Sequence, residues 1–264
     1  MYICKKNIMK KIIIKLILTL SLILVLVSCG STKKIVYLQD ADKFTEATVF
    51  FKTKLEPDDK LSIIVSAQNP ELTLPFNQPE IQVNYDVGKT QQNIKTFLID
   101  NAGYINYPLV GKIKLAGLTK DEAVELIGSK IAEYFKTPPT INIEILNFKV
   151  FVLGEVKNPM PIEVASNRIT ILEAITRAGD LTLFGKRENV LLIREVNGVK
   201  TFNRINLTNI AFVNSPFYYL MQNDVIIVEP NKTAINNAAV GANITLIVSA
   251  ASIFTTLLFF LLKN

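Results

Sequence analysis

The sequence predicts an α+β protein made of two small folded units, with one apolar segment before them and another after them. Short runs of β-branched and aromatic residues alternate with turns containing Pro or Gly through the middle of the chain, a pattern typical of antiparallel strands. Each half of this region also carries one helix that begins with a capping-box spacing of Thr and Glu. The 264 residues give room for two compact domains with appendages at both ends.

The first unit is predicted at residues 51–147. Its helix begins at Thr119, where Glu122 follows three residues later, and ends before Pro138, which cannot continue a helix. Turns rich in Pro, Gly, Asn and Asp separate the predicted strands. These strands are Leu61–Val65, Ile81–Val87, Tyr104–Ile105, Leu109–Val110, Lys112–Leu115 and Thr140–Leu146.

The second unit is predicted at residues 148–230 and repeats this organisation. A strand begins near Lys149, and a second capped helix begins at Thr170, with Glu173 three residues later and Gly179 at its end. Asn197-Gly198 is a strong signal for a two-residue hairpin. The hairpin strands are predicted at Asn189–Val196 and Val199–Arg204, and the last strands at Phe217–Leu220 and Asp224–Val228.

Residues 1–28 have the features of a lipoprotein signal peptide. Lysines precede a long apolar run, which ends in Leu26-Val27-Ser28-Cys29. This ending resembles the bacterial lipobox, in which small residues let a peptidase cut before the cysteine and the thiol accepts lipid. Cys29 is therefore the predicted lipidation site, residues 29–50 are a predicted tether, and Gly30 favours the outer membrane. The alternative is an uncleaved signal anchor with a chance cysteine, and the initiator is either Met1 or Met9.

The composition argues against several classes of function. The whole chain has a formal net charge of +6, but residues 1–28 hold five lysines and no acidic residue. The remaining chain has 24 basic and 23 acidic residues, so its net charge is about +1. That balance gives no reason to expect a nucleic-acid partner. The chain contains no His, so it lacks an imidazole base and the commonest transition-metal ligand. No catalytic, cofactor-binding or metal-binding residue is predicted, and the protein is not expected to be an enzyme.

The chain ends in an uncharged stretch, residues 238–262, after a polar connector at residues 231–237. As one helix it would be roughly 36 Å long, enough for a hydrocarbon core of about 30 Å, so a transmembrane helix is predicted. Its small and hydroxyl residues share one helical face and are expected to meet neighbouring helices or a lumen. They are Gly241, Thr245, Ser249, Ser252 and Thr256. The alternative is a simple membrane tail, although lipid on Cys29 already anchors the chain.

A series of short motifs runs from the turn before the first strand to the last strand. They are Leu55–Ile63, then Asp100, Gly103, Pro108, Gly111 and Gly117–Thr119, then Val152, Gly154–Val156 and Pro159, then Thr170–Ile175 with Ala178–Gly179, and last Tyr218–Leu220 with Asp224–Ile226. In this order, behind a lipobox, they resemble the polysaccharide export family of bacterial outer-membrane lipoproteins. The resemblance is to the Wza-like capsule-translocon type, in a short form common in Bacteroidetes.

The chain departs from the family pattern at three turns. Pro57-Asp58-Asp59 replaces Pro-Gly-Asp, Pro159-Met160 replaces Pro-Gly, and Ala178-Gly179-Asp180 replaces Ala-Gly-Gly. We expect these replacements to affect the local geometry of the turns and to leave the fold unchanged.

The resemblance implies a polysaccharide export domain followed by one β-grasp, soluble-ligand-binding unit. It also implies a ring-shaped homo-oligomer with a periplasmic lumen and a barrel of C-terminal helices through the outer membrane. Such a channel subunit would carry capsular or exopolysaccharide from the periplasm to the cell surface. The implied partners are further copies of the chain, the polysaccharide in transit and an inner-membrane chain-length regulator, or co-polymerase.

The residues leave some alternatives open. One is a periplasmic lipoprotein that binds glycan or peptidoglycan without forming a pore. The carboxylate pairs Asp58-Asp59 and Asp121-Glu122 can serve catalysis or hold a cation, but such pairs more often shape turns and helix starts. The aromatic run Phe217–Tyr219 can stack on sugar rings, but strand aromatics mostly belong to a core.

Overall fold

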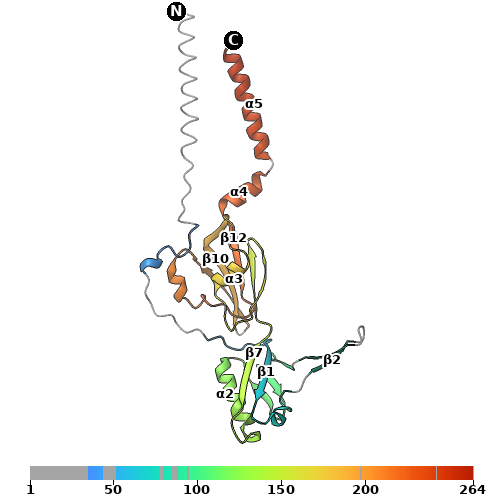
Figure 1. The fold of residues 1–264 in the computed structure, drawn as a ribbon. Helices are drawn as coiled ribbons and strands as arrows, with labels where there is room; N and C mark the ends of the chain where they lie inside the picture. Colours follow the sequence, from blue (N-terminus) through green and yellow to red (C-terminus); the bar gives the residue numbers. More distant parts are fainter. Residues whose placement is uncertain are drawn as a thin grey trace, which may run out of the picture. The chain divides into compact units, whose positions relative to one another are not determined.

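The computed structural model describes residues 35–43, 52–77, 80–84, 89–93, 95–196, 198–241 and 243–263. The chain divides into two compact units, one formed by Tyr37–Glu229 and the other by the chain before and after it. The unit Tyr37–Glu229 contains two modules (Figure 1). Each module has its own apolar core. We call residues 52–146 the first module and residues 148–229 the second module.

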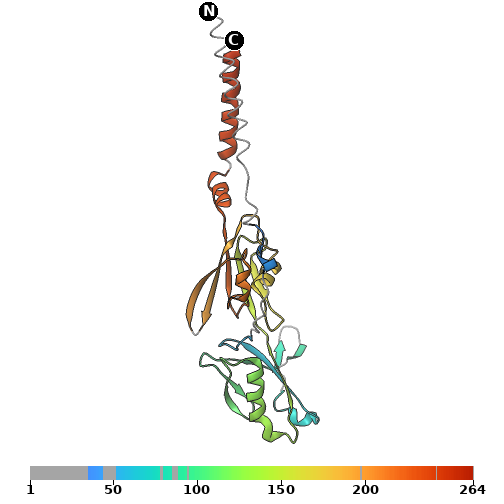
Figure 2. The same cartoon turned by 90° about the vertical axis from the view of Figure 1, so that its left-hand side faces the viewer.

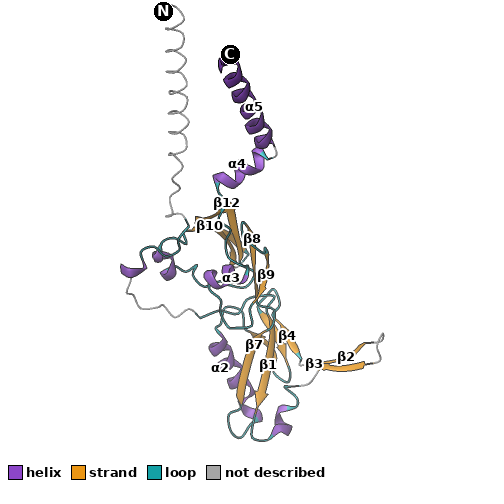
Figure 3. Cartoon of the chain, turned by 45° about the horizontal axis from the view of Figure 1, so that its top comes forward, coloured by secondary structure: helices purple, strands orange, loops and turns teal. Residues whose placement is uncertain are grey.

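The first module is built on a three-stranded antiparallel sheet in the order β4-β1-β7. Its elements are β1 (Lys60–Ser66), η3 (Pro70–Thr73), β2 (Glu80–Asn84), β3 (Lys89–Asn93), β4 (Thr96–Leu98), β5 (Tyr104–Tyr107), β6 (Gly111–Lys114), α2 (Lys120–Ile131), η4 (Ala132–Tyr134) and β7 (Thr140–Ile145). Helix α2 lies beside β1 and β7 (Figure 3) and buries Ala123, Ile127 and Ile131 in the core. Strands β2 and β3 form a separate ribbon that extends away from this sheet.

The start of α2 confirms the predicted capping box. The Thr119 hydroxyl accepts a hydrogen bond from the Glu122 N–H, and the Glu122 carboxylate accepts one from the Thr119 N–H at 2.7 Å. The strand predicted at Leu109–Val110 is wrong, because these residues form the turn between β5 and β6. Leu109 has a φ of +63° there, which no strand residue adopts.

The second module is a five-stranded sheet in the order β11-β10-β12-β8-β9, with one helix packed on one face. Strands β12 and β8 are parallel, and β8–β9 and β10–β11 are antiparallel. The elements are β8 (Lys149–Gly154), β9 (Met160–Glu163), α3 (Ile171–Arg177), β10 (Gly185–Val196), β11 (Val199–Ile205), η5 (Ile210–Asn214) and β12 (Val225–Pro230). Strands β10 and β11 form a long hairpin, drawn in orange in Figure 2. The strand predicted at Phe217–Leu220 is wrong, since only an isolated bridge joins Tyr219 to Thr170.

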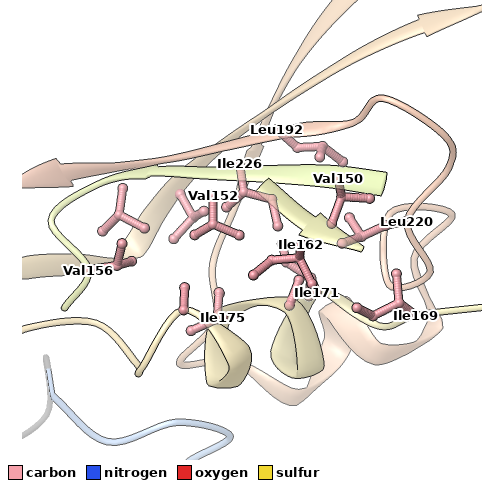
Figure 4. Close-up of a cluster of buried hydrophobic side chains, with 14 of the residues drawn as sticks. Val150, Val152, Val156, Ile162, Ile169, Ile171, Ile175, Leu192, Leu220 and Ile226 are labelled. Carbon is pink, nitrogen blue, oxygen red and sulfur yellow. The ribbon is translucent and has the colours of Figure 1, made fainter. Parts of the chain in front are cut away.

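The core of the second module lies between this sheet and α3. Side chains from β8, β10 and β12 face those of Ile171 and Ile175 on the helix (Figure 4). The capping box predicted at Thr170 and Glu173 is confirmed at the start of α3. Because α3 has only two turns, packing of its apolar face supplies most of its stability.

A short junction, residues 146–148, joins the two modules. The Asn147 side chain accepts a hydrogen bond from the Lys60 N–H at 2.8 Å and donates one to the Asp58 carbonyl at 2.9 Å. The Asn147 carbonyl accepts a bond from the side-chain amide of Gln222 at 2.9 Å, and Ile145 packs against both cores. The junction is therefore held by contacts with both modules.

The C-terminal part differs from the prediction of a polar connector followed by one helix over residues 238–262. Two helices are present, α4 (Lys232–Val240) and α5 (Asn243–Lys263), and Gly241 lies between them. Gly241 has a φ of +43°, which is outside the right-handed helical region and ends α4. Among the residues that the structure describes, no helix combines the length and apolar character needed to cross a membrane. The predicted transmembrane helix at residues 238–262 is therefore not supported.

Candidate functional site

Two turns of the same construction lie where the modules meet. The first turn, Leu55–Asp59, leads into β1, and the second turn, Leu220–Asp224, leads into β12. In each turn the final aspartate donates its N–H to the carbonyl three residues earlier at 3.2 Å. One carboxylate oxygen of that aspartate accepts from the N–H of that earlier residue at 2.8 Å. The backbone geometry of the first turn is thus repeated in the second.

The residue before each of these aspartates has a left-handed backbone. Asp58 has a φ of +70° and Asn223 a φ of +61°. Asp180, in the turn after α3, has a φ of +73°. Glycine adopts this region without strain, and Asp and Asn are the side chains that tolerate it best. Asp58 and Asp180 therefore carry backbone strain that glycine would not have at the same positions.

The two turns differ in what neutralises the buried aspartate. Arg194 on β10 donates from Nε and Nη2 to both carboxylate oxygens of Asp224, with the shortest contact at 2.6 Å. Within the described chain Asp59 forms no ion pair, and its Oδ1 is buried without a hydrogen-bond partner. Burial raises the pKa of Asp59 to about 6, although the hydrogen bond from Glu56 N–H opposes this shift.

Glu56 adds a second carboxyl group with an unusual pKa. Burial raises the pKa of Glu56 to about 7, the charges of Asp59 and Asp224 add to the increase, and Arg194 opposes it. Two carboxyl groups of the first turn therefore change protonation between about pH 6 and pH 7.

A cavity of about 800 Å³ lies between the modules, and both turns line it. The remaining wall comes from the turn Asn101–Gly103, from Lys114 at the end of β6 with Ala116 and Gly117 after it, and from the tip of the β10–β11 hairpin. Its charged lining residues are Lys54, Glu56, Asp58, Lys114 and Glu195. Across the residues that the structure describes, no group of three or more acidic or cysteine side chains is arranged to hold a metal ion.

A segment of the predicted tether, Tyr37–Gln39, is docked on the second module, and we call it the strap. The Leu38 N–H donates to the Leu207 carbonyl at 3.2 Å. The Tyr37 hydroxyl donates to a carboxylate oxygen of Asp180 at 2.6 Å. The guanidinium of Arg187 lies 5.1 Å from the centre of the Tyr37 ring, within cation–π range. The strap is therefore part of the folded second module.

The site residues predicted from the sequence are placed as follows. Cys29 and the predicted signal peptide lie outside the described residues. Gly241 lies in the break before α5, so it does not share a helix with the other predicted positions. Ser249, Ser252 and Thr256 lie on one face of α5, together with the backbone position of Thr245. Their hydroxyls donate to carbonyls of their own helix at 2.7–3.0 Å.

The carboxylate pairs have the structural roles that such pairs usually have. Asp58 and Asp59 form the first turn. Glu122 caps α2, and Asp121 pairs with Lys52 at 2.8 Å. In the aromatic run Phe217–Tyr219, the first two rings pack against the core of the second module.

Both faces of the five-stranded sheet carry apolar side chains, and on the face away from α3 they lie beside the ion pairs Lys200–Glu195 and Arg204–Glu229. Alternate side chains of β8, β10, β11 and β12 point away from α3, and we call this side the outer face. Its apolar residues are Phe151, Leu153, Leu191, Ile193, Phe202, Val225 and Ile227. Leu153 is 43 % exposed and Phe202 is 65 % exposed. A sheet face left to solvent usually carries polar side chains, so this face has the composition of a contact surface.

The sequence analysis did not identify the two turns as equivalent, and it missed Arg194 and the strap. The sequence does contain a signal for the equivalence of the two turns, because the pattern Leu-x-x-Asp/Asn-Asp occurs at Leu55–Asp59 and again at Leu220–Asp224. No local pattern marks Arg194 as the partner of Asp224, since they are 30 residues apart.

Two domain families match consecutive parts of the chain. Residues 51–146 match the family described as polysaccharide biosynthesis/export protein, and residues 148–228 match the SLBB domain. Two similar proteins, from Ralstonia nicotianae and Ralstonia solanacearum, are both named EPS I polysaccharide export outer membrane protein EpsA. Each is 32 % identical, over 142 and 130 residues respectively, which are 52 % and 47 % of this chain.

These matches cover 37 % and 34 % of the relatives, so the chain spans about a third of their length. The matched domains follow one another in the order of the two modules, and their boundary at residue 147 coincides with the junction. Residues 51–146 of this chain are therefore similar to the polysaccharide biosynthesis/export family, and residues 148–228 are similar to the SLBB domain.

Proposed function

We propose that this chain is a subunit of an outer-membrane channel that exports capsular or exopolysaccharide from the periplasm to the cell surface. The observation that carries the proposal is the order of the matched domains, an export domain followed by an SLBB domain. The names of the relatives agree with it, since both are polysaccharide export outer membrane proteins. The role is transport, and the chain performs no chemical step on the polysaccharide.

The subunits form a ring-shaped homo-oligomer, and the outer face provides a contact between neighbouring copies. Its partly exposed apolar side chains support this assignment, because a neighbouring subunit would remove them from water. In such a contact the outer face of one subunit meets a different patch on the next subunit. The contact repeats around a ring when the rotation from one subunit to the next adds up to a full turn.

The modules lie in the periplasm, and lipid on Cys29 holds the chain to the outer membrane. The lipobox ending at Cys29 supports the anchor. The energy for transport comes from elsewhere, because the sequence contains no P-loop. An inner-membrane chain-length regulator, or co-polymerase, is the partner that delivers polysaccharide to the ring.

Deletion and complementation in the producing strain test the export role. A strain without this chain is expected to synthesise the polysaccharide but to lose it from the cell surface, and the wild-type chain is expected to restore it. Complementation with Cys29→Ser is expected to restore much less surface polysaccharide than the wild-type chain, because this variant has no acyl groups to hold it at the membrane. A deletion strain with a normal surface layer would refute the proposal.

Electron microscopy of the detergent-solubilised chain tests the ring. Closed rings with a central channel are expected for the wild type, and Phe202→Asp is expected to release single subunits by placing a charge on the outer face. Leu109→Asp is the matched control, because Leu109 is 61 % exposed but lies in the first module. Single wild-type subunits would contradict the ring and favour a lipoprotein that binds glycan or peptidoglycan without a pore.

A further inference from the structure

The cavity between the modules has the dimensions and composition of a ligand site. Its volume of about 800 Å³ falls within the range of roughly 300–1,000 Å³ that is common for small-molecule sites. The lining includes the apolar residues Pro57, Val196 and Met221 together with residues that carry amide, ammonium and carboxylate groups. Such a mixed wall suits a ligand that has both C–H faces and many hydroxyl groups.

Several polar side chains of this wall are uncommitted. No hydrogen bond or ion pair inside the described chain engages the side chains of Glu56, Asp58, Asn101 or Asn223. Gln222 is different, because its side chain bonds to the Lys149 N–H and to the Asn147 carbonyl. The four uncommitted side chains can therefore bond to a ligand without giving up a contact that the fold requires.

The charges of the wall restrict the class of ligand. The lining includes two lysines, Lys54 and Lys114, and three acidic residues, Glu56, Asp58 and Glu195. Glu195 already pairs with Lys200 at 3.6 Å. No arginine lines the cavity, so an anionic ligand would lack the bidentate donor that pairs best with carboxylate and phosphate groups. The described residues also hold no arrangement suited to a metal ion. A neutral, hydroxyl-rich ligand fits, because carboxylates and amide oxygens accept from hydroxyls while amides and ammonium groups donate to them.

We propose that this cavity is a saccharide-binding cleft that holds one or two uncharged sugar residues. The inference rests on the proposed function and deepens it, since the sugar residues belong to the exported polysaccharide. Asn101 of the first module and Asn223 of the second module bind hydroxyls, Glu56 and Asp58 accept from further hydroxyls, and Pro57 and Met221 contact the C–H face.

The cleft is held in shape before a ligand arrives. The internal hydrogen bonds of the two turns fix one wall, and Arg194 holds the second turn through Asp224. Asn147 fixes the junction beside them. A ligand therefore does not have to order the backbone of this wall, which lowers the free-energy cost of binding. Because the cleft draws on both modules, a bound sugar also bridges them.

Calorimetric titration of the detergent-solubilised full chain tests the proposal. The probe is a set of oligosaccharides from partial hydrolysis of the producing strain's own surface polysaccharide, used before and after reduction of any uronate carboxylates to alcohols. We expect the neutral form to bind at least as tightly as the acidic form. Acidic fragments that bind tenfold more tightly, or no binding by either form, would overturn the proposal.

Three variants locate the binding. Asn101→Ala is expected to weaken it about tenfold, in line with the loss of one or two hydrogen bonds, and Ala102→Phe is expected to abolish it by filling the cleft. Glu125→Gln, on the exposed face of α2, is the control and should change nothing. If Ala102→Phe fails to fold, Asn101→Ala still decides, because no hydrogen bond of the described chain uses its side chain. Unchanged binding in Asn101→Ala would refute the cleft.

The two proposals fail separately. A chain that binds no saccharide while its deletion removes the surface polysaccharide refutes the cleft and leaves the export role intact. A chain that binds saccharide in the cleft while the deletion strain keeps its surface layer refutes the export role.

Discussion

The first and second turns show how one backbone design can carry opposite electrostatics. Leu55–Asp59 and Leu220–Asp224 share the same two hydrogen bonds and the same left-handed residue before the aspartate. Asp224 has Arg194 against both of its oxygens, and Asp59 has an oxygen without a partner. The turn therefore requires the aspartate as a hydrogen-bond acceptor and does not require a neighbouring cation. The neighbouring cation determines how much the buried, ionised carboxylate lowers the free energy of unfolding at neutral pH.

The largest expected effect is on the paired aspartate. Arg194→Ala leaves Asp224 buried without its cation and also removes hydrogen bonds to the Pro216 and Tyr219 carbonyls. We expect the free energy of unfolding to fall by about 3–5 kcal/mol, measured by urea denaturation of the detergent-solubilised chain. Arg204→Ala is the control, since Arg204 also pairs with a carboxylate but is 49 % exposed, and should cost at most about 1 kcal/mol. Equal losses in both variants would show that the Asp224 pair has no special role.

At Asp59, the aspartate without an ion pair, a substitution is expected to increase the free energy of unfolding. The folded pKa of Asp59, about 6, lies above its ordinary value of 3.8, so the folded state holds its proton more tightly than the unfolded state. Its contribution to stability is therefore complete below about pH 4 and is lost as the pH rises to about 6. Asp59→Asn is expected to raise the free energy of unfolding by about 1–2 kcal/mol at pH 8 and to leave it unchanged at pH 3.5.

The control for this prediction is the same substitution in the other turn. Asp224→Asn should destabilise the chain at pH 8, because it leaves Arg194 buried without its carboxylate. Destabilisation of Asp59→Asn at pH 8 would mean that the first aspartate has a neutralising partner after all.

The smallest expected effect concerns the left-handed residue that the turns share. Asp58→Gly relieves a φ of +70° and is expected to stabilise the chain by about 0.5 kcal/mol, after the greater entropy of Gly in the unfolded chain is subtracted. Asp180→Gly is the matched comparison at a φ of +73°. There we expect a net loss, because the Asp180 carboxylate also binds the Tyr37 hydroxyl and the Leu181 N–H. Thermal unfolding distinguishes the two, and a gain in both would show that the strap contact contributes little.

The sequence predicted features that depend on neighbouring residues. The capping boxes at Thr119 and Thr170 and the β10–β11 hairpin follow from side chains within a few positions of each other. The α+β class and the two domain families follow from such motifs in order.

The errors arise where distant contacts or backbone geometry decide. The Leu109–Val110 pair is apolar enough for a strand, but the turn before β6 forces Leu109 to a positive φ. The break at Gly241 interrupts an apolar stretch that has no charge or proline to mark it. The sequence analysis could not predict the cleft for a similar reason, because the walls of the cleft come from segments that only the folded chain brings together.

The strap gives the second module an unusual order of assembly. Its first segment precedes the whole first module in the chain, so the first module is an insertion within the second. Tyr37 and Asp180 are 143 residues apart, and closing so long a loop requires that its docking surface already exists. During synthesis from the N-terminus, the strap therefore has no surface to dock on until β10 and β11 have paired. Strap docking is therefore expected to follow the formation of the strands and turns that supply its partners, Asp180 and Leu207.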